Sequence, residues 1–262
     1  MLLRILQSTI ILGLLSCVAL SADQTFDPGP WSTTELEQII AASRHIDAPG
    51  ERIVSLSRHF IDTPYVEDTL VGNPDTAEQL VINLAGFDCF TFLDTVEALR
   101  RTSEIVHFPE EMKEVRYRGG KVAYTNRRHF FSDWVVGTET MVQDVTQEVG
   151  QGSAQVVIKQ LNLKSDGTHW LPEIPVVKRE ITYIPVSRIN QDVLSALESG
   201  DYVGVYTDRA GLDVSHTGLI VKAENRLMLR HASARNSVKK VVDVDLLEYL
   251  QGKPGLVVFR AR

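Results

Sequence analysis

Apolar residues recur at two spacings along the chain, and the change of spacing divides the chain into two parts. In the first part they return every three or four residues, which predicts helices. One helix follows the capping box Ser32–Glu35, and Pro49 opens a second. From about Ala154 the pattern changes to short runs rich in β-branched and aromatic residues, which predicts strands.

Six runs in the second part fit strands, because glycine, aspartate, asparagine or proline separates them. They are 155–158, 176–184, 202–206, 218–221, 227–229 and 256–259. Two short helices, 191–197 and 244–250, interrupt these strands. The predicted fold class is therefore α+β, within one domain over 23–262. Its helical part, about 31–150, packs on a mainly antiparallel sheet formed by about 151–262.

The first residues have the pattern of an export leader. Arg4 is the only charge in residues 1–22, and the apolar core 5–15 is too short to span a bilayer. Two cleavage sites compete. The run Leu14–Cys17 resembles a bacterial lipobox, in which Cys17 would become lipid-modified and anchor the protein to the membrane, whereas Ala19–Ser21 fits an ordinary signal peptidase. We favour the lipobox and expect a protein of the periplasm or envelope.

Charge and cysteine content narrow the chemistry. Removing the leader changes the formal net charge from −7 to −8, which argues against a nucleic-acid partner. Cys89 is then the only cysteine, so no disulfide can form within the chain. A single thiol in an oxidising compartment requires either a packing or a chemical explanation.

Cys89 lies at the start of a third predicted helix, for which Asp88 is a good N-cap. Unpaired N–H groups and a partial positive charge at a helix N-terminus favour the thiolate, so we expect a lowered pKa here. Two histidines, His216 and His231, border strand-like runs. A cysteine hydrolase needs a base and a group that orients it, and these residues fit both roles. The backbone N–H of Cys89 is the expected oxyanion donor.

Each of these residues also has a plainer interpretation. A lone cysteine is most often a small buried hydrophobe, and a histidine at a strand end is satisfied by backbone and solvent. Asp88 needs no role beyond capping. Cys89, His216 and His231 would also suffice as metal ligands if they converged. We expect no metal and no cofactor.

Five short segments occur in an order that resembles the papain-like, NlpC-type cell-wall hydrolases. The segments are Thr63-Pro64-Tyr65, Asp88-Cys89, Gly200-Asp201, His216-Thr217-Gly218-Leu219 and His231-Ala232-Ser233. The resemblance implies that Cys89, His216 and His231 are the catalytic set. It also implies that the phenol of Tyr65 reaches the cleft, to bind substrate or to help hold the oxyanion.

Within these hydrolases the chain resembles the N-acetylmuramoyl-L-alanine amidase-like group. The run 83–92, which reads Asn-Leu-Ala-Gly-Phe-Asp-Cys-Phe-Thr-Phe, carries this resemblance. It implies cleavage of the N-acetylmuramoyl-L-alanine amide of peptidoglycan or its muropeptides. The γ-D-glutamyl–diamino acid bond, cut by other enzymes of this type, is the alternative within the class. A non-catalytic envelope module that binds glycan or peptide is the alternative outside it.

The chain departs from the NlpC-type pattern in two places. Phe90 follows the cysteine where serine is usual, and the interval from Cys89 to His216 is longer than in the smallest enzymes. The longer interval implies an insertion that shapes the substrate groove. Its candidate substrate contacts are Asn126, Arg128 and Trp134, and Arg128 would bind a carboxylate. Phe130, Phe131 and Trp134 also fit a helix face in the core. Asp88 and Ser215 complete the predicted substrate-binding or oxyanion residues.

Overall fold

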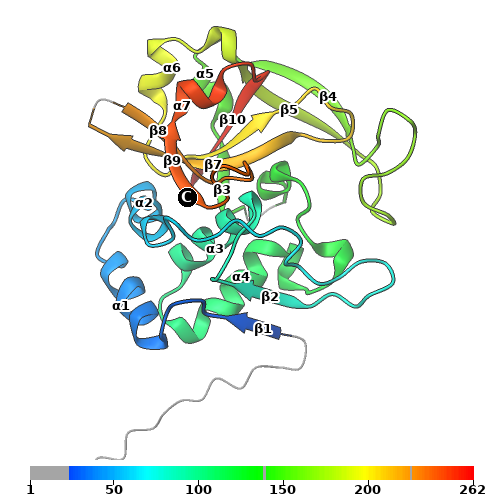
Figure 1. The fold of residues 1–262 in the computed structure, drawn as a ribbon. Helices are drawn as coiled ribbons and strands as arrows, with labels where there is room; N and C mark the ends of the chain where they lie inside the picture. Colours follow the sequence, from blue (N-terminus) through cyan, green and yellow to red (C-terminus); the bar gives the residue numbers. More distant parts are fainter. Residues whose placement is uncertain (1–23, 138–139, 225) are drawn as a thin grey trace, which may run out of the picture.

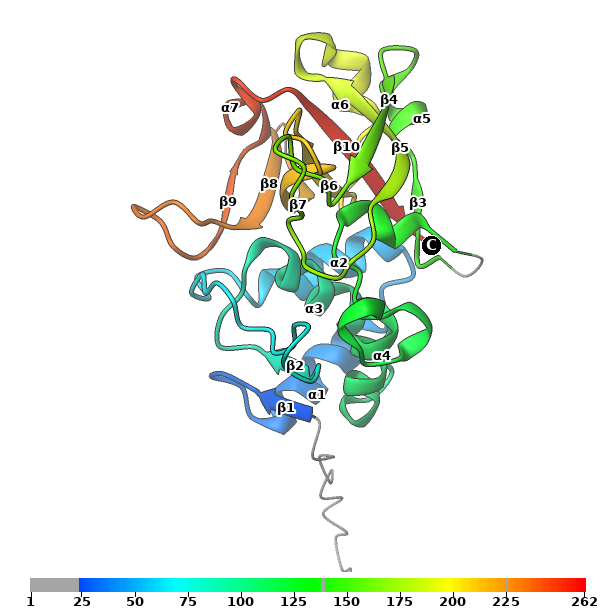
Figure 2. The same ribbon diagram turned by 90° about the vertical axis from the view of Figure 1, so that its right-hand side faces the viewer.

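The computed structural model describes residues 24–137, 140–224 and 226–262. Helices from the first part of the chain lie below a larger sheet in Figure 1, and Figure 2 shows the same two regions from the side. The predicted mixed α+β fold with a mainly antiparallel sheet is confirmed. The predicted leader, 1–22, and Cys17 lie outside the described residues. No helix of the described part is long and apolar enough to span a bilayer.

Seven α-helices occur in the described residues, and the first four belong to the helical region. They are α1 (Thr33–Ser43), α2 (Pro49–Arg58), α3 (Cys89–Arg101), α4 (Phe108–Arg116), α5 (Thr146–Gly150), α6 (Gln191–Ala196) and α7 (Leu246–Leu250). The predicted starts of α1, α2 and α3 are confirmed. At α1 the Ser32 hydroxyl accepts from the Glu35 N–H at 3.2 Å, and the Glu35 carboxylate accepts from the Ser32 N–H at 2.8 Å.

The strands of the described residues form a small sheet and a large one. They are β1 (Gln24–Asp27), β2 (Leu80–Asn83), β3 (Val142–Asp144), β4 (Gln155–Leu161), β5 (Val177–Pro185), β6 (Tyr202–Tyr206), β7 (Val214–Ala223), β8 (Arg226–Ala232), β9 (Val241–Asp245) and β10 (Gly255–Ala261). Strands β1 and β2 pair in parallel. The large sheet has the order β4-β5-β10-β6-β7-β8-β9, with β3 also on β10, and its strand pairs are antiparallel.

Helices cover both faces of this sheet, so its central strands are apolar on both sides. On β10, Val257 packs with the helical region, whereas its neighbour Val258 packs with α5, α6 and α7. On β7, Leu219 and Ile220 divide between the two faces in the same way. Successive side chains of a strand point to opposite faces, which is why one strand serves two cores.

Candidate active site

The N-terminus of α3 holds Cys89 through main-chain hydrogen bonds. One carboxylate oxygen of Asp88 accepts from the N–H groups of Phe90 at 2.8 Å and Thr91 at 2.7 Å, as an N-cap does. The hydroxyl of Thr217 on β7 donates to the main-chain carbonyl of Cys89 at 2.8 Å. Because Thr217 follows His216, this bond fixes the first residue of the helix against the strand that carries the histidine.

The two histidines form a hydrogen-bonded pair on neighbouring strands. Nε2 of His216 on β7 lies 2.7 Å from Nδ1 of His231 on β8. The β7–β8 register pairs Leu219 with Arg230, which places both histidines on one face in a diagonal relation. Gly218 lies between them, where a Cβ atom would come within 3.1 Å of the His231 Cβ. Glycine at this position therefore leaves the space that the His231 ring requires.

Tyr249 on α7 contacts both rings of the pair. The centroid of its ring lies 4.8 Å from that of His231 and 5.7 Å from that of His216. Two cationic groups lie near the Tyr249 ring, the Arg235 guanidinium at 5.5 Å and the Lys253 ammonium at 5.9 Å from its centroid. None of these three residues was predicted from the sequence.

Main-chain contacts hold Tyr65 next to the segment that leads into α3. Its N–H donates to the Lys239 carbonyl at 2.9 Å, and it bridges in parallel to Phe87, two residues before Cys89. Burial, followed by the nearby Cys89 and Asp88, raises the pKa of the Tyr65 phenol to about 12. The phenol is therefore protonated at neutral pH and able to donate a hydrogen bond.

The electrostatics of Cys89 differ from the expected thiolate. Part of the residue is exposed, but the protein around the sulfur raises the pKa of the thiol to about 11, with the negative charge of Asp88 adding to the effect. Hydrogen bonds from Thr217 act in the opposite direction without reversing it. The expectation of a lowered pKa is therefore wrong for the free protein, because desolvation and a neighbouring carboxylate outweigh the helix terminus.

Both histidines are also neutral in the free protein. Burial lowers the pKa of His216 to about 3, with further lowering by His231, Lys253 and Arg235. Burial and Arg235 lower the pKa of His231 to about 4. The resting site therefore holds a thiol and two neutral imidazoles. Within the described residues no hydrogen bond links the sulfur to a histidine ring.

Two of the remaining predicted contacts border the thiol and the histidine pair. Asp88 precedes Cys89, and its capping bonds occupy one carboxylate oxygen. Ser215 is exposed and precedes His216 at an irregularity in the β6–β7 register. Its hydroxyl donates to the Val205 carbonyl at 3.4 Å. Both residues lie at the predicted site, but these bonds account for their positions without a substrate.

The three candidates from the long interval lie in different surroundings. The Asn126 amide donates to the Lys121 carbonyl at 3.3 Å. Arg128 donates through Nη1 to main-chain carbonyls at the C-terminal end of α4, and with Asp88 it lines a small cavity of about 170 Å³. Trp134 is 1% exposed and packs against Phe90 with ring centroids 5.8 Å apart. The structure therefore places Trp134 in the core rather than at a substrate surface.

Phe90, the main departure from the NlpC-type pattern, joins α3 to the longer interval. Besides Trp134, it meets Phe131 at 6.4 Å between ring centroids. Phe131 in turn stacks on Phe259 of β10 at 4.3 Å. An apolar residue after the cysteine thus packs the insertion against the sheet, a contact that serine would not make.

The described residues offer no convergent metal-ligand set. No group of three or more histidine, cysteine, aspartate or glutamate side chains there is arranged to hold an ion. His216 and His231 direct ring nitrogens at each other, at 2.7 Å, rather than at a shared point. The alternative in which Cys89 and both histidines bind a metal therefore does not fit this geometry.

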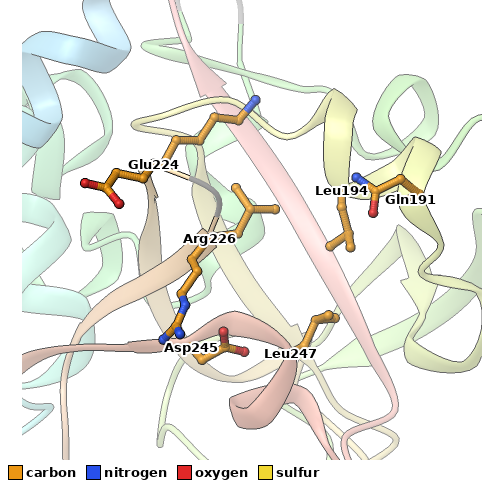
Figure 3. Close-up of a pocket in the computed structure, with 8 residues that line it drawn as sticks. Gln191, Leu194, Glu224, Arg226, Asp245 and Leu247 are labelled. Carbon is orange, nitrogen blue, oxygen red and sulfur yellow. The ribbon is translucent and has the colours of Figure 1, made fainter.

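A cavity of about 540 Å³ lies away from the candidate catalytic residues, between α6, the end of the β7–β8 pair and α7. Figure 3 shows side chains that line it, among them Gln191, Leu194, Glu224, Arg226, Asp245 and Leu247. Glu224 and Arg226 border it, and residue 225 between them lies outside the described residues. Because Cys89, His216 and His231 do not line this cavity, its size does not identify the reaction site.

Solved structures with this fold include amidases. A crystal structure of an N-acetylmuramoyl-L-alanine amidase from Bacteroides uniformis ATCC 8492 has a TM-score of 0.69 and 29% identity, covering 82% of this chain and 99% of its own. A Legionella pneumophila protein that matches the DUF1460 family model has a TM-score of 0.73, and the alignment covers 87% of this chain and 94% of that protein. At 22% identity it supports the fold alone. A Bacteroides fragilis protein named as a candidate xylanase has a TM-score of 0.62 and 26% identity, covering 78% of this chain and 98% of its own.

These comparisons define the class as amidase-like hydrolases that act on amide bonds. The family model for N-acetylmuramoyl-L-alanine amidase-like proteins matches residues 55–256, and the chain belongs to that family. No curated protein matches the chain. The matched residues include Cys89, His216, His231 and Tyr249.

Proposed function

We propose that this protein is a cysteine-dependent peptidoglycan amidohydrolase with a papain-like, NlpC-type active site. The observation that carries the proposal is the placement of Cys89 at the start of α3, tied through Thr217 to the strand that bears the His216–His231 pair. A nucleophile, a base and an orienting group are the three parts that acyl transfer through a thioester requires.

The chemistry follows from which ring nitrogens are engaged. His231 occupies Nε2 of His216, so Nδ1 is the nitrogen that takes the thiol proton. The Cys89 sulfur attacks the amide carbonyl, and the resulting oxyanion is held by the Cys89 N–H and the Tyr65 hydroxyl. The imidazolium returns its proton to the leaving amine as the C–N bond breaks. Water, deprotonated by the same nitrogen, then hydrolyses the thioester to the free acid and restores the thiol.

Proton transfer accompanies attack in this scheme, because the resting pair is neutral. The pKa of the thiol is about 11 and that of His216 about 3, so a preformed thiolate–imidazolium pair is unfavourable. In this scheme Nε2 of His216 donates to Nδ1 of His231, which leaves Nδ1 of His216 unprotonated, the tautomer that a base needs. His231 is thus a positioning residue in this mechanism.

The family favours one substrate bond. We propose the amide between N-acetylmuramic acid and L-alanine, the bond after which both the family and the Bacteroides uniformis amidase are named. The proposed site of action is the bacterial envelope, since the N-terminal residues predict export. Lipid anchoring through Cys17 is part of that proposal, and mass analysis of the mature N-terminus tests it.

The test is incubation with a set of defined muropeptides, followed by mass spectrometry of the products. Free N-acetylmuramic acid glycan and a peptide that begins with L-alanine are expected. Cleavage at the γ-D-glutamyl bond would indicate the alternative endopeptidase, and a shortened glycan would indicate a glycosidase. The matched control is Cys89→Ala. Equal hydrolysis by the parent and this variant would contradict the thiol mechanism, and no hydrolysis by either would favour a binding module.

A further inference from the structure

Two cations lie at the Tyr249 ring, next to the histidine pair. Arg235 comes from the segment between β8 and β9, and Lys253 follows α7, so the two approach from different elements. Both are exposed, and their charged groups lie 5.5 Å and 5.9 Å from the centroid of the ring. Two positive charges thus lie within 6 Å of the centroid of one aromatic ring, in a chain whose formal net charge is −7.

Neither cation has an ion-pair partner among the residues that the structure describes. Their neighbours differ in this respect. Lys239 pairs with Glu67 at 3.0 Å, and Arg230 pairs with Asp243 at 2.7 Å. An isolated surface cation is ordinarily only solvated, but two without counter-ions beside a reaction centre form an anion-attracting position. The guanidinium fork of Arg235 also suits a carboxylate, which accepts two parallel hydrogen bonds.

We propose that Arg235 and Lys253 form a subsite that binds a carboxylate of the leaving peptide. The proposal rests on the proposed function. In that reaction His216 returns its proton to the leaving amine, so the departing peptide lies on the His216 side of the thiol. Arg235 and Lys253 lie on that side, around the ring that contacts His216. In the peptide stem, the residue after L-alanine is a γ-linked D-glutamate with a free α-carboxylate, the nearest anion available.

An occupied subsite also acts on the base. Lys253 and Arg235 both contribute to the low pKa of His216, after burial and His231. A carboxylate bound between these cations offsets their charge, which strengthens His216 as a base only when substrate is in place. Replacing both cations with Gln removes these charges permanently, so loss of the subsite is expected to appear mainly as a higher KM for a carboxylate substrate.

The experiment compares two substrates that differ by one charge. N-acetylmuramoyl-L-alanyl-D-glutamate has the α-carboxylate, and its D-isoglutamine counterpart has a neutral amide there. For the parent protein we expect kcat/KM to favour the carboxylate substrate by roughly tenfold or more, in keeping with a charge-assisted hydrogen bond. The double variant Arg235→Gln/Lys253→Gln is expected to lose that preference, so that kcat/KM becomes similar for the two substrates.

The control variant Lys178→Gln/Arg188→Gln removes the same charge from exposed positions on and just after β5, three strands from β7 in the sheet. It is expected to keep the preference. Hydrolysis of both substrates with a ratio unchanged in the Arg235/Lys253 variant would overturn the subsite but not the proposed function.

Calorimetric binding of L-alanyl-D-glutamate tests the subsite without turnover. The parent is expected to bind this dipeptide more tightly than the Arg235/Lys253 variant does. Equal binding would overturn the subsite, even if no muropeptide is cleaved. Absence of cleavage combined with a difference in binding would instead overturn the proposed hydrolysis and support the anion site.

Discussion

The two sides of the candidate active site are held in different ways. On the helix side, Asp88 caps the amides of the next two residues, so groups close in sequence set the conformation at Cys89. On the sheet side, strand register, the space left by Gly218 and the Tyr249 ring from another element position His216 and His231. The nucleophile side is thus determined locally, and the base side by contacts between distant residues.

This contrast predicts that the two sides differ in tolerance to substitution. A cap is lost with one side chain and costs about 1 kcal/mol of stability. The placement of an imidazole pair depends on packing. A displacement of about 1 Å can lower the rate about 100-fold. Changes on the sheet side that leave the fold intact are therefore expected to affect the reaction more than changes to the cap.

The largest expected effect comes from removing a reacting group on either side. Cys89→Ser and His216→Gln should each lower kcat by about 10⁴-fold or more, because each removes one half of the same proton transfer. The double variant should be little worse than either single one, since groups that act as a unit are not additive. Single-turnover hydrolysis of a defined muropeptide measures this. Additive losses would show that the two sides act independently.

A single methyl group tests the sheet side alone. Gly218→Ala places a Cβ 3.1 Å from the His231 Cβ and 2.8 Å from the Arg230 carbonyl oxygen. We expect kcat to fall by up to about 100-fold as the pair is displaced. Gly204→Ala on β6 is the control, because its added Cβ meets Val214 and Phe131 instead. It should lower Tm with little effect on kcat per folded molecule, and equal kcat losses in the two variants would contradict this assignment.

The resting protonation state predicts the pH dependence of alkylation. With the pKa of Cys89 near 11, the thiolate fraction at neutral pH is smaller than for a free thiol of pKa about 8.5. The iodoacetamide rate at Cys89, followed by peptide mass spectrometry, should therefore rise about tenfold per pH unit from pH 7 to 10. A plateau between pH 5 and 8 would instead reveal a thiolate–imidazolium pair.

The smallest expected effect isolates the cap. Asp88→Ala should lower the free energy of unfolding by about 1 kcal/mol. The control is Asn190→Ala at the N-cap of α6, where the Asn190 amide oxygen accepts from the Val193 N–H at 3.0 Å. It should lower the free energy of unfolding by the same amount. Only the Asp88 variant should alkylate faster at pH 8, because the Asp88 charge raises the pKa of Cys89. Asp88→Asn should keep the stability and the faster alkylation. Denaturant unfolding and alkylation rates measure both effects.

The same contrast explains which parts of the fold could be predicted from the sequence. The starts of α1 and α3 depend on Ser32 and Asp88, whose partners lie two or three residues away. The strand at 202–206 was predicted with its bounds, because it is apolar throughout. The sequence pattern does not indicate strand β9, and it extends the predicted helix 244–250 over the last two residues of that strand. Those residues are extended because β9 pairs with β8, a partner that local spacing does not indicate.

The site was predictable to a similar extent. Ordered short segments pointed to Cys89 and the two histidines, and in the structure the histidines pair with each other while Thr217, next to His216, binds the Cys89 carbonyl. Tyr249 was missed because a tyrosine in a short amphipathic helix resembles an ordinary core residue. The raised pKa of the thiol was missed for a related reason. Helix position can be read from sequence, whereas the burial that outweighs it depends on the assembled fold.

The bond from the Thr217 hydroxyl to the Cys89 carbonyl has a practical consequence. It ends on the main chain, so it does not depend on the sulfur. Removal of the thiol in Cys89→Ala therefore leaves the link between α3 and β7 in place, and with it the arrangement of the histidines beside an empty nucleophile position. Such a variant is well suited to capture an uncleaved muropeptide in a crystal, where the path of the glycan and the peptide can be seen directly.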